Sequence, residues 1–175
     1  MALSNALKCL INDMAQAVRD FYGIKTPITN IDDIVNKMGG KIIEDSSLSL
    51  SDGKIRKTGA KSFEIHLSPF QSPERKTFTI AHELGHLFLH MGFQTSPQKW
   101  DSQDNVYFYR NGNSELEYQA NEFAAAFLMP QNQYKEIMAK NTEGIMVNTL
   151  EIANFFHVSV EAAANRGKWL GYLKW

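Results

Sequence analysis

The chain has 175 residues, which is enough for one domain with its own hydrophobic core. Its formal net charge is only −1, which is too small to produce a strong electrostatic field around the protein. That balance argues against a surface that attracts nucleic acid or an anionic membrane. Cys9 is the only cysteine, which excludes an internal disulfide and a thiolate metal cluster. There is no signal-peptide pattern and no apolar run near the roughly 20 residues that span a bilayer. We therefore expect a single cytoplasmic domain over residues 1–175, with no membrane partner.

The first part of the chain predicts two helices and then two strands. From hydrophobic periodicity, the predicted elements are helices over 3–22 and 30–38 and strands over 41–44 and 60–67. Gly23 ends the first helix, and Thr29 or Asn30 caps the second. Residues 46–57 are polar and rich in turn residues, so no strand is predicted there.

The rest of the chain is mainly helical. Ser72 followed by Pro73 predicts a helix start, because a capping residue precedes a proline at the first helical position, and this helix runs to about Met91. The connection over 92–113 is long and polar, with a possible strand over 105–109, and connections of this length are more often functional than idle. Later helices are predicted over 114–129, 132–139, 146–156 and 160–170.

The run His82-Glu83-Leu84-Gly85-His86 lies in the middle of the helix that starts at Pro73. Two histidines four residues apart lie on one helical face, so their imidazole nitrogens can both reach one Zn²⁺ at about 2.0–2.1 Å. Glu83 is rotated off that face and can hold and deprotonate a water beside the metal. This spacing is the H-E-x-x-H signature of zinc metallopeptidases.

A catalytic zinc site takes a third protein ligand and leaves the fourth position for water. His90 continues the same helical stripe, but about 12 Å of helical rise separates it from His82, so one ion cannot bridge the two. His90 therefore stays as a candidate contact to the substrate or the transition state. The alternative is a structural histidine near the end of the helix.

Glu117 is the better candidate for the third ligand. It shares a helical face with Ala120, Asn121 and Ala124, whose small side chains allow this helix to approach the histidine helix. Asn121 lies one turn further on and can accept a hydrogen bond from a ligating histidine. The alternative is a capping box, in which Glu117 bonds the backbone at Ser114.

With these residues the chain resembles the ImmA/IrrE family of bacterial metallopeptidases. The matching stretches are 77–90, TFTIAHELGHLFLH, and 117–130, EYQANEFAAAFLMP. The second stretch is similar to the family's E-x-x-A-N-x-F-A-x-x-x-L-M-P pattern. The resemblance covers most of the chain. It implies a gluzincin-like site in which the two histidines and Glu117 hold one Zn²⁺ and Glu83 is the general base.

The resemblance also implies a biological role. Similar proteins are zinc-dependent endopeptidases that cleave a helix-turn-helix transcriptional repressor, often the product of a neighbouring gene, of a mobile element, prophage or stress regulon. An exposed strand edge over 62–67 would bind such a substrate in extended form, and the 92–113 connection would set specificity. Candidate contacts to the substrate or transition state are His90, Tyr107, Tyr109 and Arg110.

A rival hypothesis is a regulatory DNA-binding protein. Residues 146–172 have a helix-turn-helix-like outline, with Ser159 as the cap of the second helix. With the flanking Lys174 counted, the charged residues of this segment leave a net charge of only about +1, too little for a surface that tracks phosphates, so direct nucleic-acid binding is not expected. A non-catalytic regulatory or toxin-type protein on a metallopeptidase scaffold is the remaining alternative.

The elements together predict an α+β fold. A small, mostly antiparallel sheet packs on the two active-site helices, with a helical N-terminus and a helix-turn-helix-like C-terminal segment.

Overall fold

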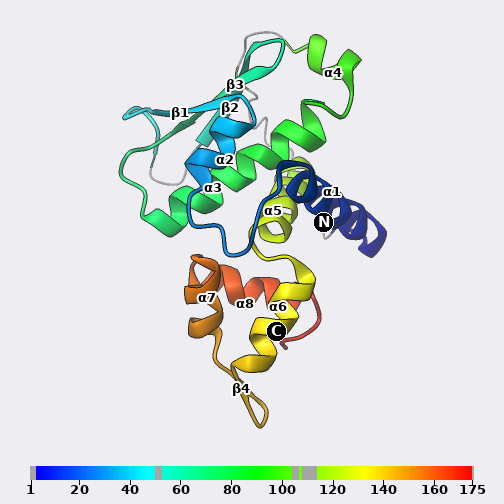
Figure 1. Cartoon of the computed structure of the whole chain (residues 1–175), viewed down its shortest axis with the longest axis vertical. Coiled ribbons are helices and arrows are strands. Elements are labelled where there is room, and N and C mark those ends of the chain that lie inside the picture. The colour runs from blue at the N-terminus through cyan, green and yellow to red at the C-terminus, as the bar shows by residue number, and fades with distance from the viewer. Residues whose placement is uncertain (1–2, 50–52, 104–106, 108–113, 175) are drawn as a thin grey trace.

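The computed structural model describes residues 3–49, 53–103, 107 and 114–174, and it has the predicted α+β fold. The helices are α1 (Asn5–Tyr22), α2 (Ile31–Lys37), α3 (Pro73–Gly85), α4 (Pro97–Asp101), α5 (Ser114–Leu128), α6 (Gln131–Lys140), α7 (Thr149–Phe156) and α8 (Val160–Trp169). The strands are β1 (Gly40–Glu44), β2 (Gly53–Gly59), β3 (Ser62–Leu67), β4 (Thr142–Glu143) and β5 (Met146–Val147). In Figure 1 the sheet and α3 lie in the upper half, α6, α7 and α8 lie in the lower half, and α5 lies between them.

The two N-terminal helices begin and end at the predicted capping residues. Gly23 ends α1 in the left-handed conformation, with φ at 63°, which glycine adopts without a steric penalty. Asn30 begins α2, because its side-chain oxygen accepts a hydrogen bond from the backbone N–H of Asp33. α1 packs along α5, so the helix that carries Glu117 is supported on that side.

The three-stranded sheet is mixed, with the order β1-β3-β2. β3 pairs in parallel with β1 and antiparallel with β2, and a separate antiparallel hairpin joins β4 to β5. Two sequence predictions are wrong here. The turn-rich stretch 46–57 contains most of β2, and the strand expected to form an exposed edge, 62–67, is the centre of the sheet.

The polar composition of β2 explains why its strand pattern is hard to detect. Ile55 turns into the core and is fully buried, while Lys54 and Arg56 on either side face the outer surface of the sheet. Arg56 pairs there with Glu64 of β3, at 2.7 Å between Nη2 and Oε2. β2 therefore forms through cross-strand contacts with β3 that its own sequence does not show.

The helix that starts at Pro73 ends in a wider turn than the sequence predicts. The Ser72 hydroxyl caps α3 by accepting from the backbone N–H of Arg75. The α-helical pattern stops at Gly85, and His86–His90 continue as a π-helical turn in which the backbone N–H of Met91 donates to the carbonyl of His86. Such turns inside helices are frequent at functional sites.

The predicted connection over 92–113 contains the short helix α4. Trp100 of α4 is buried, and its indole N–H donates to the carbonyl of Ala60 at 2.7 Å, so α4 is anchored to the turn between β2 and β3. The possible strand over 105–109 falls mostly outside the described residues, and so do Tyr109 and Arg110.

The C-terminal helices have the predicted helix-turn-helix-like outline. α7 begins at Thr149, later than the sequence predicts, because β5 first pairs with β4. The Ser159 hydroxyl caps α8 by accepting from the backbone N–H of Ala162 at 3.1 Å. In the part of the chain that the structure describes, no helix combines the length and the apolar character that crossing a bilayer requires.

Candidate metal centre

α3 and α5 approach each other closely because neither has a large side chain at the contact. A Cβ atom on Gly85 would lie 3.0 Å from both the Cα and the carbonyl oxygen of Ala120, which is shorter than ordinary van der Waals contact. A larger residue at position 85 would therefore push the helices apart. This contact places the polar side chains of α5 opposite the histidines of α3 and the π turn.

Three side chains direct their ligand atoms toward one point. Nε2 of His82 and Nε2 of His86 lie 3.0 Å apart. The Glu117 carboxylate lies 3.2 Å from the first nitrogen and 3.3 Å from the second. Ligand atoms bound to one tetrahedral zinc at about 2.0–2.1 Å are themselves about 3.3 Å apart. His82, His86 and Glu117 can therefore hold a metal ion.

The second ring nitrogen of His82 is held by α5. Nδ1 of His82 lies 2.8 Å from Oδ1 of Asn121, the contact that the spacing of Glu117 and Asn121 predicts. An amide oxygen can only accept, so Nδ1 of His82 carries the proton and Nε2 presents its lone pair to the point where the ligand atoms meet. This is the tautomer that a metal ligand needs.

A longer hydrogen-bond chain holds His86. Nδ1 of His86 lies 2.9 Å from Nδ1 of His90, and Nε2 of His90 lies 3.2 Å from Oε1 of Gln119 on α5. Because the Gln119 oxygen accepts, His90 carries its proton on Nε2 and its Nδ1 accepts from His86. Burial lowers the pKa of His90, which favours this neutral ring, and the hydrogen bond to Gln119 acts in the opposite direction.

His90 therefore lies behind a candidate ligand, against the ring nitrogen of His86 that points away from His82. Its side chain is buried, and it lies outside the group of ligand atoms, as the rise of the helix requires. The structure places His90 in a hydrogen-bond chain between His86 and Gln119, and a direct contact with the substrate stays a prediction. The sequence does not single out Gln119, because nothing in its spacing distinguishes it from an exposed helical glutamine.

Glu83 is buried on the side of α3 that faces β2. A Cβ atom on Gly53 of β2 would lie 2.9 Å from Oε1 of Glu83 and 2.7 Å from Cγ2 of Thr79. β2 can pass this close to Glu83 because residue 53 has no side chain. The sequence alone does not point to Gly53. No strand is predicted there, so nothing indicates that this position lies against Glu83.

The IrrE N-terminal-like domain family (Peptidase_M78) matches residues 39–168, a range that includes the whole sheet of three strands and all three candidate ligands. The chain belongs to this metallopeptidase family. Among solved structures, a Mycobacterium tuberculosis transcriptional regulator is 17% identical, with a TM-score of 0.56. The match covers 93% of this chain and 47% of that one, so this chain spans about half the length of its structural relative. No curated protein matches the chain.

In this member of the IrrE-like family, Tyr107 lies away from the candidate ligands. Its ring contacts His66 edge-on, with 5.2 Å between centroids, and Nζ of Lys54 lies 4.3 Å from the ring centroid. His66 and Lys54 alternate with Ile65 and Ile55, which turn into the core toward α3. Tyr107 therefore covers the outer face of the sheet, and the structure does not bring it to the metal centre.

Proposed function

We propose that this chain is a zinc-dependent endopeptidase that hydrolyses a peptide bond in a protein substrate. The observation that carries the proposal is the convergence of two imidazole nitrogens and one carboxylate, within 4.8 Å of one another, next in sequence to the buried Glu83. The hydrogen bonds behind the rings make both nitrogens lone-pair donors, so three electron-rich groups share one space. Two histidines and one glutamate form a donor set of catalytic zinc, with one position left for water.

Glu83 is the proposed general base. A zinc ion held by His82, His86 and Glu117 would lower the pKa of a bound water toward about 7 and polarise the scissile carbonyl. Glu83 takes a proton from the attacking water and delivers it to the nitrogen of the leaving amine. A side chain at residue 53 would press on this carboxylate, so Gly53 leaves Oε1 the room that these two transfers need.

β2 lies at one edge of the three-stranded sheet, and this edge supports the binding of an extended substrate. β3 has partners on both sides, whereas β2 pairs with β3 alone among the described strands. The edge of β2 that no described strand occupies belongs to the strand that approaches Glu83 at Gly53. A substrate segment that adds to this edge would carry its peptide groups past Glu83.

A helix-turn-helix transcriptional repressor of a mobile element, prophage or stress regulon is the proposed substrate. The resemblance to ImmA/IrrE peptidases supports it, and a transcriptional regulator with the same fold is compatible with a role in gene control. A substrate of this class is consistent with a cytoplasmic location. We expect the repressor encoded beside the gene of this chain to be cleaved at one site.

Direct DNA binding through α8 has less support. Arg166 is 2% exposed and pairs with Glu122 at 3.0 Å, so it cannot reach a phosphate. The remaining basic residues of the 146–172 segment and its flank are balanced by acidic ones, which leaves no basic surface. A non-catalytic regulator on the same scaffold is the rival that an experiment has to separate.

Glu83→Gln separates catalysis from metal binding. Glutamine keeps the shape of the side chain but cannot take a proton, so cleavage of the repressor should fall by roughly 10²–10⁴-fold. Bound zinc, measured by elemental analysis, should stay at about one per chain. Glu115→Gln, an exposed change on α5, is the matched control and should keep both cleavage and zinc.

Two results would contradict the proposal. The first is a Glu83→Gln chain that cleaves as fast as the wild type. The second is a zinc-loaded wild type that binds the repressor and leaves it intact, which would favour the non-catalytic regulator.

A further inference from the structure

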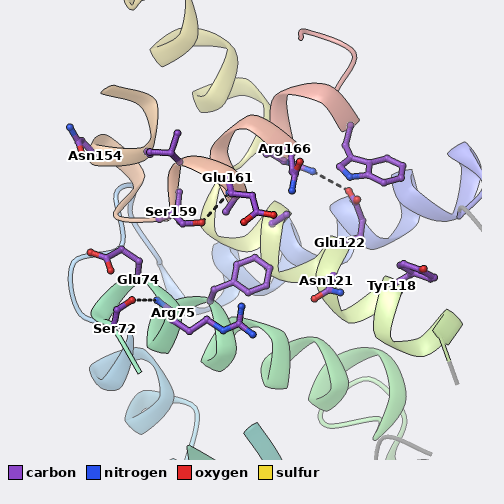
Figure 2. A pocket seen from close by; sticks show the side chains of 18 of the residues that line it. Ser72, Glu74, Arg75, Tyr118, Asn121, Glu122, Asn154, Ser159, Glu161 and Arg166 are labelled. Carbon is purple, nitrogen blue, oxygen red and sulfur yellow. Dashed lines mark hydrogen bonds and ion pairs between the residues drawn. The ribbon is translucent and has the colours of Figure 1, made fainter. Parts of the chain in front are cut away.

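A cavity of about 960 Å³ separates α3 from the C-terminal helices. Most of its lining comes from α3, α5, α7 and α8, with Lys8 from α1, and Figure 2 shows Arg75 on α3 facing Glu161 on α8 across it. The family match and the proposed chemistry give this cavity no role. It is distinct from the β2 edge, because Gly53 and its neighbours Thr79 and Glu83 do not line it.

Three large apolar side chains on the walls of the cavity are about half exposed to solvent. Tyr118 is 48% exposed, Val160 43% and Trp169 43%, and Phe78 adds a further aromatic ring. A pocket for a small molecule normally encloses most of its ligand. Walls that stay half exposed suit the surface of another protein, and exposed apolar patches commonly mark such sites.

The charged residues around the cavity are of both signs. Lys8 and Arg75 are matched by Glu74 and Glu161. Arg166 also lines it but is paired with Glu122, so it adds no net positive charge. A balanced rim does not attract a polyanion, whereas apolar walls with a mixed-charge rim complement the apolar face and charged flanks of an amphipathic helix.

The metal centre shares a supporting side chain with the cavity. Asn121 lines it, and the same side chain holds Nδ1 of His82 at 2.8 Å. Tyr118, on the cavity wall, directly follows Glu117 in α5. A helix seated in the cavity would thus lie one side chain away from a candidate zinc ligand.

We propose that this cavity is an exosite that binds an amphipathic helix of the protein substrate while a separate, extended segment of the same substrate reaches Glu83. The proposal rests on the proposed function, because a helical repressor supplies such a helix. Docking outside the cleavage site would let the enzyme select a folded protein and not merely a peptide sequence.

Val160→Asp tests the exosite by placing a charge on its apolar wall. Leu150→Asp is the matched control, since both residues lie in the first turn of a C-terminal helix, and Leu150 is 52% exposed outside the cavity. Both changes are made in the full, zinc-loaded Glu83→Gln chain, which holds the repressor without cutting it. Fluorescence anisotropy with the labelled repressor encoded beside this gene measures the Kd.

Val160→Asp should raise the Kd by roughly 10-fold or more, and Leu150→Asp by less than about 2-fold. Trp169→Gln, a second change on the same wall, should behave like Val160→Asp and guards against a local folding defect. Equal Kd values for the Val160 and Leu150 variants, or no binding by any chain, would overturn the exosite.

Cleavage by the chain with Glu83 intact is measured separately, so the two proposals can fail independently. A repressor that is cut, with the Kd unaffected by Val160→Asp, leaves the peptidase standing and removes the exosite. A Kd that responds to Val160→Asp, with no cleavage, leaves the docking site and removes the peptidase.

Discussion

Two buried polar clusters join α5 to its neighbours, and they differ in the kind of groups that meet. At the metal centre, Nε2 of His82 and Nε2 of His86 lie 3.0 Å apart with the Glu117 carboxylate against both. At the other cluster, the Arg166 guanidinium donates to a Glu122 oxygen at 3.0 Å and to Asn12 Oδ1 at 2.7 Å. The first gathers acceptors, and the second matches donors to acceptors.

This difference separates a candidate site from a structural connection. Arg166, Glu122 and Asn12 satisfy one another, so their cluster needs nothing further and fixes α8 to α5 and α1. The lone pairs of the metal centre repel one another unless a cation lies between them. Both clusters are buried, so burial does not distinguish them. They differ because only acceptors meet at the metal centre, whereas donors are paired with acceptors around Arg166.

The largest expected effect on stability comes from breaking the matched cluster. Arg166→Ala leaves the Glu122 carboxylate, whose side chain is 9% exposed, without its charged partner. The free energy of unfolding should fall by about 3–5 kcal/mol, measured by urea denaturation of the zinc-loaded chain. The zinc affinity of the folded fraction should stay within about 2-fold of the wild type, because no candidate ligand is touched.

An exposed ion pair provides the control for this prediction. Lys140 and Glu136 also form a close pair, at 2.7 Å, but their side chains are 64% and 62% exposed. Lys140→Ala should therefore cost less than about 0.5 kcal/mol. Similar losses in the two variants would mean that the buried cluster is not the connection described above.

The contact between α3 and α5 is the next test. In Gly85→Ala the new methyl group would lie 3.0 Å from the backbone of Ala120, which should cost about 1–3 kcal/mol of stability and move Glu117 away from the histidines. Zinc affinity, measured by competition with a chromophoric chelator, should fall with it. Adding Ala120→Gly should not restore the affinity, because the close atoms are main-chain atoms. Full restoration would show that side-chain crowding alone sets the contact.

The hydrogen-bond chain from His86 to Gln119 predicts that a substitution weakens zinc binding less the further it lies from His86. His90→Ala removes the acceptor for Nδ1 of His86 and should weaken zinc binding by about 10–100-fold. Gln119→Ala acts one bond further away and should have the smaller effect. A larger loss of zinc affinity in Gln119→Ala than in His90→Ala would contradict the order of these hydrogen bonds.

Local spacing is sufficient to predict the parts of the site that lie on helices. His82 and His86 share a face because four residues make about one helical turn, and Glu117 and Asn121 share theirs for the same reason. The caps at Asn30, Ser72 and Ser159 are equally local, since each side chain bonds the backbone three residues on. These features depend on nothing outside their own segment.

Features that depend on pairing between distant segments could not be predicted in this way. Whether 62–67 is an edge or a centre is decided by β1 and β2, and β2 shows its strand character only in contact with β3. The place of Tyr107 on the outer face follows from that register, and Gly53 matters only because β2 passes Glu83. The ligand role proposed for Glu117 depends on the family resemblance, because spacing alone is compatible with a metal ligand and with a helix cap.

Zinc content of the full chain, purified without a histidine tag, tests the central claim most directly when wild type, Glu117→Ala and Glu115→Ala are compared. Glu117 supplies the carboxylate of the converging group, and Glu115 lies exposed two residues earlier in α5. About one zinc per chain in the wild type and in Glu115→Ala, sharply reduced in Glu117→Ala, is the predicted result. Equal zinc in all three chains, or none in the wild type after reconstitution, would contradict a site built from His82, His86 and Glu117.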